Sequence, residues 1–170
     1  MGYDLRCKLF TYDSKENKCH VISQGWINEL KTLNRECYSS TLSDIKECKF
    51  EHDLSDVNTE DGEEQDGNIY DVESFCNASK ELEHKMDESI RKIIRFENLM
   101  TSIDYFKLTE EQRESFLETL ETEKSLYNEY KDKNEVCNYL IGIMNYFADE
   151  EMDETYGTRD SKVYLFVIAE

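Results

Sequence analysis

The sequence predicts an α+β fold, in which a small antiparallel sheet packs against a layer of about three antiparallel helices. Apolar and polar residues alternate near the N-terminus, and apolar residues recur at helical spacing through the second half. A continuous run of β-branched and aromatic residues stands close to the C-terminus. With 170 residues, of which 38% are hydrophobic, the chain is expected to form a single domain with a buried core.

The N-terminal segment is predicted to be a β-hairpin. In YDLRCKLFTY apolar side chains alternate with basic ones, DSKEN supplies a polar turn, and KCHVIS follows as the return strand. If Tyr12 pairs with Lys18, the alternation places Leu9 opposite Val21 on one face of the sheet.

The segment after the hairpin is predicted to contain a short helix, an ambiguous stretch and an acidic loop. A short helix is expected from Trp26 to Arg35, because its apolar residues stand at helical spacing. Residues 38–55 fit a strand and a helical turn equally well. The stretch EHDLSDVNTEDGEEQDGNIYDVE, residues 51–73, holds ten acidic residues and no Lys or Arg. Its two glycines favour an acidic loop at about residues 51–70.

Three helices are predicted in the second half of the chain. The first begins near Asp71 and carries an apolar stripe from Phe75 to Met100. The second begins at TEEQ, where Thr109 and Gln112 form a capping box. The third covers NEVCNYLIGIMNYFADE, is apolar nearly all round, and is expected to be the most buried.

The last predicted element is a strand at KVYLFVIA, residues 162–169. Such a continuous apolar run is typical of a strand that is covered on both faces. Because a two-stranded hairpin is only marginally stable by itself, we expect this terminal strand to pair with the N-terminal hairpin.

Composition also indicates where the protein works. No apolar run approaches the roughly 20 residues that cross a bilayer, and the N-terminus lacks an apolar leader, so we expect a cytoplasmic protein. The six cysteines are scattered without a C-x-x-C motif, which favours reduced thiols over disulfides or a metal site. The absence of proline and the abundance of Lys, Asn, Ile and Tyr suggest a low-GC bacterium or its phage.

Motifs identify no catalytic or metal centre. An EF-hand with Gly67 at position 6 would have Gly62 at position 1, where a carboxylate ligand is required. Glu81 and His84 have the spacing of a di-iron ligand pair, but the sequence contains no second pair. Nucleophile-elbow, P-loop and dinucleotide-binding patterns are absent as well. We therefore expect no enzymatic activity, no metal and no cofactor.

Acidic blocks are the most distinctive feature of the sequence, whose formal net charge is −19. Along the helix after Thr109, glutamates recur at i, i+3, i+7 and i+10, a spacing at which like charges destabilise an isolated helix. Blocks of one sign differ from ordinary mixed-charge surfaces and favour a basic partner. The residues predicted to contact it are Glu51, Asp53, Asp56, Glu60, Asp61, Glu63, Glu64, Asp66, Glu111, Glu114, Glu118, Glu121, Asp149, Glu150, Glu151, Asp153 and Glu154.

In size and acidity the chain resembles the phage-encoded DNA-mimic inhibitors of restriction and CRISPR nucleases. This hypothesis makes it a non-catalytic inhibitor that occupies a basic nucleic-acid-binding surface of a host defence nuclease, and that binds neither nucleic acid nor membranes itself. The alternatives are an immunity protein against a basic toxin, a structural or assembly subunit with a merely solubilising surface, and a divalent-metal carboxylate enzyme. The stripe of the long helix also offers a surface for homo-oligomerisation.

Overall fold

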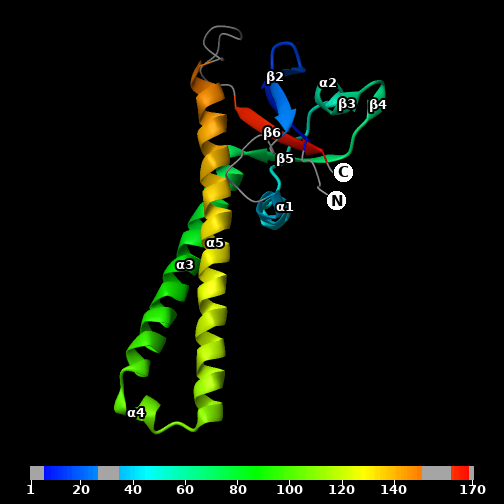
Figure 1. The fold of residues 1–170 in the computed structure, drawn as a ribbon. Helices are drawn as coiled ribbons and strands as arrows, with labels where there is room; N and C mark the ends of the chain where they lie inside the picture. The colour runs from blue at the N-terminus through cyan, green and yellow to red at the C-terminus, as the bar shows by residue number, and fades with distance from the viewer. Residues whose placement is uncertain (1–5, 27–34, 151–161, 169–170) are drawn as a thin grey trace. The chain divides into compact units, whose positions relative to one another are not determined.

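The computed structural model describes three stretches of the chain, residues 6–26, 35–150 and 162–168. The chain divides into two compact units: unit 1 is Met1–Ala78 with Val136–Glu170, and unit 2 is Ser79–Glu135. Two long helices, α3 (Val72–Met100) and α5 (Glu110–Glu150), run through both units (Figure 1). The single domain therefore stays a prediction.

Unit 1 is built on a four-stranded antiparallel sheet with the order β2-β1-β6-β5 (Figure 1). Its strands are β1 (Arg6–Asp13), β2 (Lys18–Trp26), β6 (Val163–Ile168) and β5 (Gly67–Asp71). The predicted fold class is confirmed, because the N-terminal hairpin and the C-terminal strand share one sheet packed against helices. The fourth strand was not predicted. It lies within the acidic stretch, where Ile69 and Tyr70 provide two buried residues that favour a strand.

The predicted register of the hairpin is wrong by one residue. Lys18 pairs with Asp13 rather than with Tyr12, because a four-residue turn at 14–17 closes the hairpin. Asn17 ends this turn with a φ of 51°, a left-handed conformation that asparagine tolerates. A bulge at Ile22 then shifts the register once more between Leu9 and Phe10.

One face of the sheet is covered by the segment at residues 48–57. Phe10 and Phe166 are fully buried on this face and pack in one cluster with Val57 of helix α2 (Ser55–Asn58). The Phe10 ring stacks on Tyr164 with centroids 5.3 Å apart. Residues 48–57, which cover this face, lie in segments whose structure was predicted as ambiguous (38–55) or as a loop (51–70).

Helices cover the other face of the sheet. The Tyr70 ring lies 5.5 Å from the ring of Phe75 at the start of α3, and its hydroxyl donates to the Leu42 carbonyl of α1 (Arg35–Asp44) at 3.0 Å. From α5, Val136 and Met144 are fully buried. The prediction that the terminal strand is covered on both faces is confirmed.

The acidic stretch contains further structure besides β5. The strands β3 (Thr59–Glu60) and β4 (Glu63–Glu64) form a small hairpin whose two-residue turn is Asp61-Gly62. Both turn residues have positive φ values, 52° and 84°, as a type I′ turn requires. The prediction of a loop at residues 51–70 is therefore wrong for much of this stretch, and the Asp-Gly pair was the available signal.

The helix expected from Trp26 to Arg35 falls mostly on residues that the structure does not describe. Trp26 ends β2, and residues 27–34 lie outside the described residues. Arg35 begins α1 instead, so the first part of the ambiguous segment 38–55 is helical.

Unit 2 is an antiparallel helical hairpin closed by the short helix α4 (Ile103–Phe106). The rings of Phe96 and Phe116 meet across it at 4.9 Å, and the Ser89 hydroxyl donates to the Glu123 carboxylate at 2.6 Å. The prediction of separate second and third helices is wrong, because α5 continues through 41 residues. Its middle, KDKNE, contains neither Gly nor Pro to end it.

The predicted capping box at the start of α5 is confirmed. The Thr109 backbone N–H donates to Gln112 Oε1 at 3.0 Å, and the Gln112 N–H donates to Thr109 Oγ1 at 3.2 Å. No helix in the described part of the chain is long and apolar enough to span a membrane.

Candidate functional site

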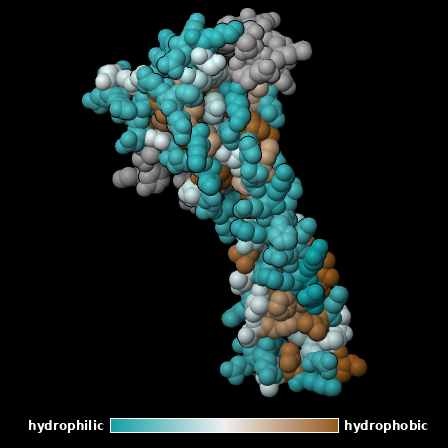
Figure 2. Space-filling model, turned by 180° about the vertical axis from the view of Figure 1, so that it is seen from behind, coloured by the Kyte–Doolittle hydropathy of each residue, from teal (hydrophilic) through white to brown (hydrophobic). Residues whose placement is uncertain are grey.

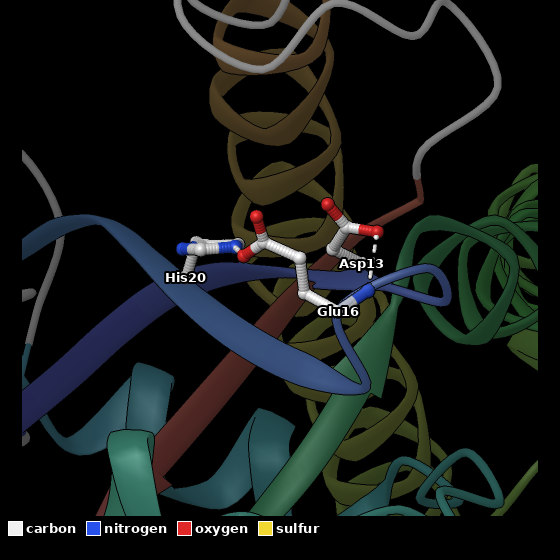
Figure 3. Close-up of side chains that lie close together, drawn as sticks. All are labelled: Asp13, Glu16 and His20. Carbon is white, nitrogen blue, oxygen red and sulfur yellow. Dashed lines mark hydrogen bonds and ion pairs between the residues drawn. The ribbon is translucent and has the colours of Figure 1, made fainter.

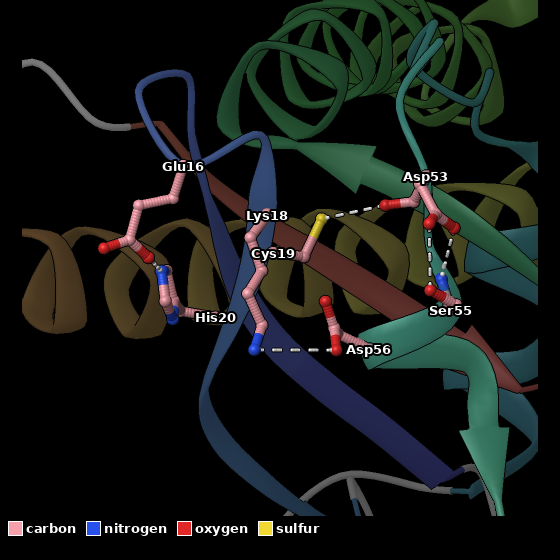
Figure 4. A network of polar contacts seen from close by, with 7 residues as sticks. All are labelled: Glu16, Lys18, Cys19, His20, Asp53, Ser55 and Asp56. Atoms are coloured by element: carbon pink, nitrogen blue, oxygen red, sulfur yellow. Dashed lines mark hydrogen bonds and ion pairs between the residues drawn. The ribbon is translucent and has the colours of Figure 1, made fainter.

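Some carboxylates predicted to meet a partner already hold unit 1 together. Asp53 accepts hydrogen bonds from the Ser55 N–H at 2.9 Å and from the Ser55 hydroxyl at 3.0 Å, which hold the pKa of the Asp53 carboxyl below its usual range (Figure 4). Asp56 lies 3.9 Å from the Lys18 ammonium group. Asp53 therefore holds the start of α2, and Asp56 links α2 to the N-terminal hairpin.

An ion pair and a hydrogen bond likewise hold two carboxylates of the small hairpin formed by β3 and β4. The Arg6 guanidinium contacts the Glu60 carboxylate at 2.7 Å. Asn58 donates from Nδ2 to Glu64 Oε1 at 3.0 Å. Glu60 and Glu64 thus contribute to folding whether or not they also contact a partner.

The other acids of this segment are exposed, and within the described residues their carboxylates have no hydrogen bond or ion pair. They are Glu51, Asp61, Glu63 and Asp66. Asp61 and Glu63 belong to the small hairpin and Asp66 follows it closely, so the β3–β4 turn is one freely available acidic surface of unit 1.

The glutamates on α5 form the second acidic surface, and they belong to unit 2. Glu111, Glu114 and Glu118 are exposed, and no described residue pairs with their carboxylates. Glu121 lies 3.7 Å from Lys124. At about 1.5 Å of rise per residue, the row from Glu111 to Glu121 extends roughly 15 Å.

The third acidic block is only partly described. Asp149 and Glu150 are the last two residues of α5. Glu151, Asp153 and Glu154 lie outside the described residues. The structure therefore places two of the three predicted blocks, one in each unit.

The turn of the N-terminal hairpin brings together three residues that the sequence reasoning missed: Asp13, Glu16 and His20 (Figure 3). Their ligand atoms lie within 4.8 Å of one another. These residues could not be grouped from the predicted register. The four-residue turn of the structure brings Asp13, at the end of β1, close to Glu16 and to His20 of β2.

Ordinary turn chemistry accounts for this cluster. Asp13 Oδ1 accepts from the backbone N–H groups of Lys15 at 2.7 Å and Glu16 at 3.3 Å, which hold the pKa of the Asp13 carboxyl below its usual range. The Glu16 carboxylate lies 3.4 Å from Nε2 of His20 (Figure 4). Carboxylates and imidazole are suitable ligands for a transition-metal ion, but here they already stabilise the hairpin.

Three of the described cysteines lack the surroundings of reactive nucleophiles. Burial raises the pKa values of the Cys7, Cys19 and Cys48 thiols to about 11, so very little thiolate exists near neutral pH. Cys19 Sγ donates to the Asp53 carbonyl at 3.3 Å (Figure 4). Cys7, Cys19, Cys48, Cys76 and Cys137 are free thiols.

The pair Glu81 and His84 forms no metal site with other described residues. His84 is exposed, and its Nε2 atom lies 3.5 Å from the Glu88 carboxylate on the next turn. The chain matches no protein-family model, no curated protein and no solved structure.

Proposed function

We propose that this protein is a non-catalytic acidic inhibitor that occupies the basic nucleic-acid-binding surface of a host defence nuclease. The single observation that carries this proposal is the row of glutamates on α5. Glu111, Glu114 and Glu118 are exposed and lack intramolecular partners among the described residues. Like charges at this spacing disfavour a helix. Glu121 contacts Lys124 at 3.7 Å, but the other three carboxylates are available for a basic partner.

The spacing of the row is suited to mimicry of a phosphate backbone. The four glutamates from Glu111 to Glu121 place one carboxylate per roughly 5 Å of helix, using about 1.5 Å of rise per residue. A DNA strand places one phosphate per about 3.4 Å of axis. A cleft lined with Lys and Arg would gain similar electrostatic stabilisation from either surface.

The inhibitor would act in the cytoplasm of a bacterium, where a phage or mobile element would encode it. Its acidic surfaces repel nucleic acid and anionic lipid, so the inhibitor competes with nucleic acid and does not bind it. The exposed acids around the Asp61-Gly62 turn of unit 1 offer a second surface of the same sign.

The test is affinity capture from a lysate of the native host at roughly 50 and 300 mM salt, since electrostatic binding weakens steeply over this range. We expect a basic nuclease that is retained at low salt and released by added duplex DNA or RNA. The capture is repeated with the chain in which Glu111, Glu114, Glu118 and Glu121 are all changed to Gln. This variant should lose at least about tenfold in affinity while its circular dichroism is unchanged.

A matched control removes the same number of charges elsewhere. It changes four exposed glutamates outside the proposed surfaces to Gln, namely Glu47, Glu73, Glu81 and Glu135. We expect this control to retain most of its affinity. Equal losses in both variants would reduce the effect to net charge, and a captured partner that nucleic acid does not displace would contradict the proposal.

A further inference from the structure

Exposed large hydrophobic side chains gather on unit 2. Of the seven such side chains in the described part of the chain, six lie between residues 90 and 117. They are Ile90, Ile94, Leu99, Ile103, Phe106 and Leu117. Figure 2 shows hydrophobic surface over the lower part of the molecule, which is the helical hairpin. An amphipathic hairpin in water would normally bury such residues.

Three of these side chains lie on the same side of the hairpin. On α3, Ile90 and Ile94 share a stripe with Glu97, at i, i+4 and i+7. On α5, Leu117 and Lys124 are seven residues apart and therefore also share a stripe. The Lys124 ammonium lies 3.7 Å from the Glu97 carboxylate, so the two stripes face the same side. The ion pair between Lys92 and Glu123, at 3.6 Å, marks the opposite side.

Most charged residues that border this apolar area are carboxylates, and Lys124 lies among them, in contact with Glu97 and Glu121 at 3.7 Å. On α3, Glu83 and Asp87 precede Ile90 by seven and three residues, and both are exposed. On α5, Glu114 precedes Leu117 by three residues, and Glu121 follows it by four. We name the acid-bordered patch by its members, Ile90, Ile94 and Leu117 with Glu83, Asp87, Glu114 and Glu121.

We propose that the acid-bordered patch binds a basic amphipathic helix of a partner protein. Such a helix carries apolar side chains three or four residues apart, which would cover Ile94 and Leu117, between Lys and Arg residues that meet the surrounding carboxylates. This inference rests on the proposed function in one respect, namely that the partner is basic. It adds the form of the contact and an apolar component that salt does not weaken.

Charge complementarity selects this occupant over others. A second copy docked on the patch would bring the same carboxylates against Glu114 and Glu121, and like charges at close range oppose association. An anionic membrane is repelled for the same reason. A basic amphipathic helix would cover the apolar side chains and also pair with the surrounding carboxylates.

The chain supplies a matched control on the opposite side of the hairpin. Ile94 and Leu99 are each 50% exposed on α3. Leu99, however, shares its stripe with Lys92 and Arg95, at i−7 and i−4. A basic helix should avoid that side, so substitution of Leu99 tests whether exposed hydrophobicity alone accounts for binding.

The experiment uses the full chain and a fluorescent synthetic peptide of about 18 residues, in which Leu recurs at i, i+3 and i+4 and Lys fills the other positions. Binding is followed by fluorescence anisotropy at roughly 150 mM salt. We expect Ile94→Ser combined with Leu117→Ser to weaken binding at least tenfold, and Leu99→Ser to change it less than twofold. A peptide of the same composition with scrambled order should bind at least tenfold more weakly.

The inference would be overturned by equal losses from Leu99→Ser and from the combined Ile94→Ser and Leu117→Ser change, or by equal affinity for the ordered and scrambled peptides. Self-association of the free chain that Ile94→Ser abolishes, measured by analytical ultracentrifugation, would assign the patch to a second copy and also overturn it. No nucleic acid enters this assay. Failure of the peptide to bind therefore leaves the competition test of the proposed function intact, and failure of that competition leaves the peptide result intact.

Discussion

Unit 1 buries its apolar residues on both faces of a sheet, whereas unit 2 has only the single interface between two helices. Of the 21 buried hydrophobic residues in the described part of the chain, three belong to unit 2: Leu82, Ile93 and Leu120. Unit 2 nevertheless has most of the exposed large hydrophobic side chains. Burial of apolar surface is the main stabilising contribution to folding. Unit 1 should therefore provide most of the stability, and unit 2 most of the surface for recognition.

The largest effect is expected from the core of unit 1. Phe166 is 1% exposed and packs in the cluster under α2, so Phe166→Ala should lower the free energy of unfolding by about 3 to 5 kcal/mol. Phe116 in unit 2 is only half-buried, against Phe96 and Tyr105. Its change to Ala should cost about 1 to 2 kcal/mol. Urea unfolding of both variants measures the difference, and equal losses would contradict the comparison.

A second prediction concerns the strand that the sequence did not predict. A Cβ at Gly67 would lie 2.4 Å from the Val167 carbonyl oxygen and 2.6 Å from the Phe166 ring. Gly67→Ala should therefore displace β5 from β6 and cost about 1 to 3 kcal/mol.

The control is Gly142 in α5, which is exposed and where a Cβ would meet nothing within 4 Å. Gly142→Ala should raise the stability by about 0.5 to 1 kcal/mol, because alanine is the better helix former. Melting temperatures of the two variants should move in opposite directions. A neutral Gly67→Ala would mean that β5 is not closely packed on β6.

The smallest predicted effect is a dependence on pH at the junction of β5 and α3. Burial by itself raises the pKa of Asp71, but hydrogen bonds from the Ser74 N–H and hydroxyl, together with the Lys162 charge, outweigh it and lower the pKa. A carboxyl with a lower pKa in the folded state stabilises the fold above its unfolded pKa of about 4, and this stabilisation is lost as the pH falls through the folded pKa.

Asp71→Asn should thus cost about 0.5 to 1 kcal/mol at pH 7, and the difference from the parent chain should shrink towards pH 2. Urea unfolding across this range measures it, with Glu135→Gln, at an exposed position outside the acidic row, as the control. A difference that stays constant with pH would show that the Asp71 charge does not stabilise this junction.

Local patterns predicted the elements whose partners are close in sequence. The capping box at Thr109 and Gln112 was predicted because both groups lie within one helical turn. The hairpin was predicted from alternation, but its register was not, because one left-handed residue, Asn17, decides where the turn closes. Strand β5 was missed because only the pairing of Ile69 and Tyr70 with β6 makes that short segment a strand.

The acidic surfaces, too, were predicted only where local spacing arranges them. The row from Glu111 to Glu121 was predicted because helical spacing alone arranges it. The use of Glu60 within the fold was not predicted, since its partner Arg6 is 54 residues away in sequence. Asp53 bonds to Ser55, only two residues away, so that contact was a local signal that the prediction overlooked. Which carboxylates remain available to a partner depends on those contacts.

The sequence by itself determined the fold class, the periodic faces of the helices and the acidity, because these follow from local spacing and composition. Only the tertiary structure decided the register of the hairpin, the fourth strand and the division of acids between folding and surface. It also decided that Ile90, Ile94 and Leu117 share one side, through the contact between Glu97 and Lys124. Contacts between residues distant in sequence depend on how the whole chain packs, and local spacing does not encode them.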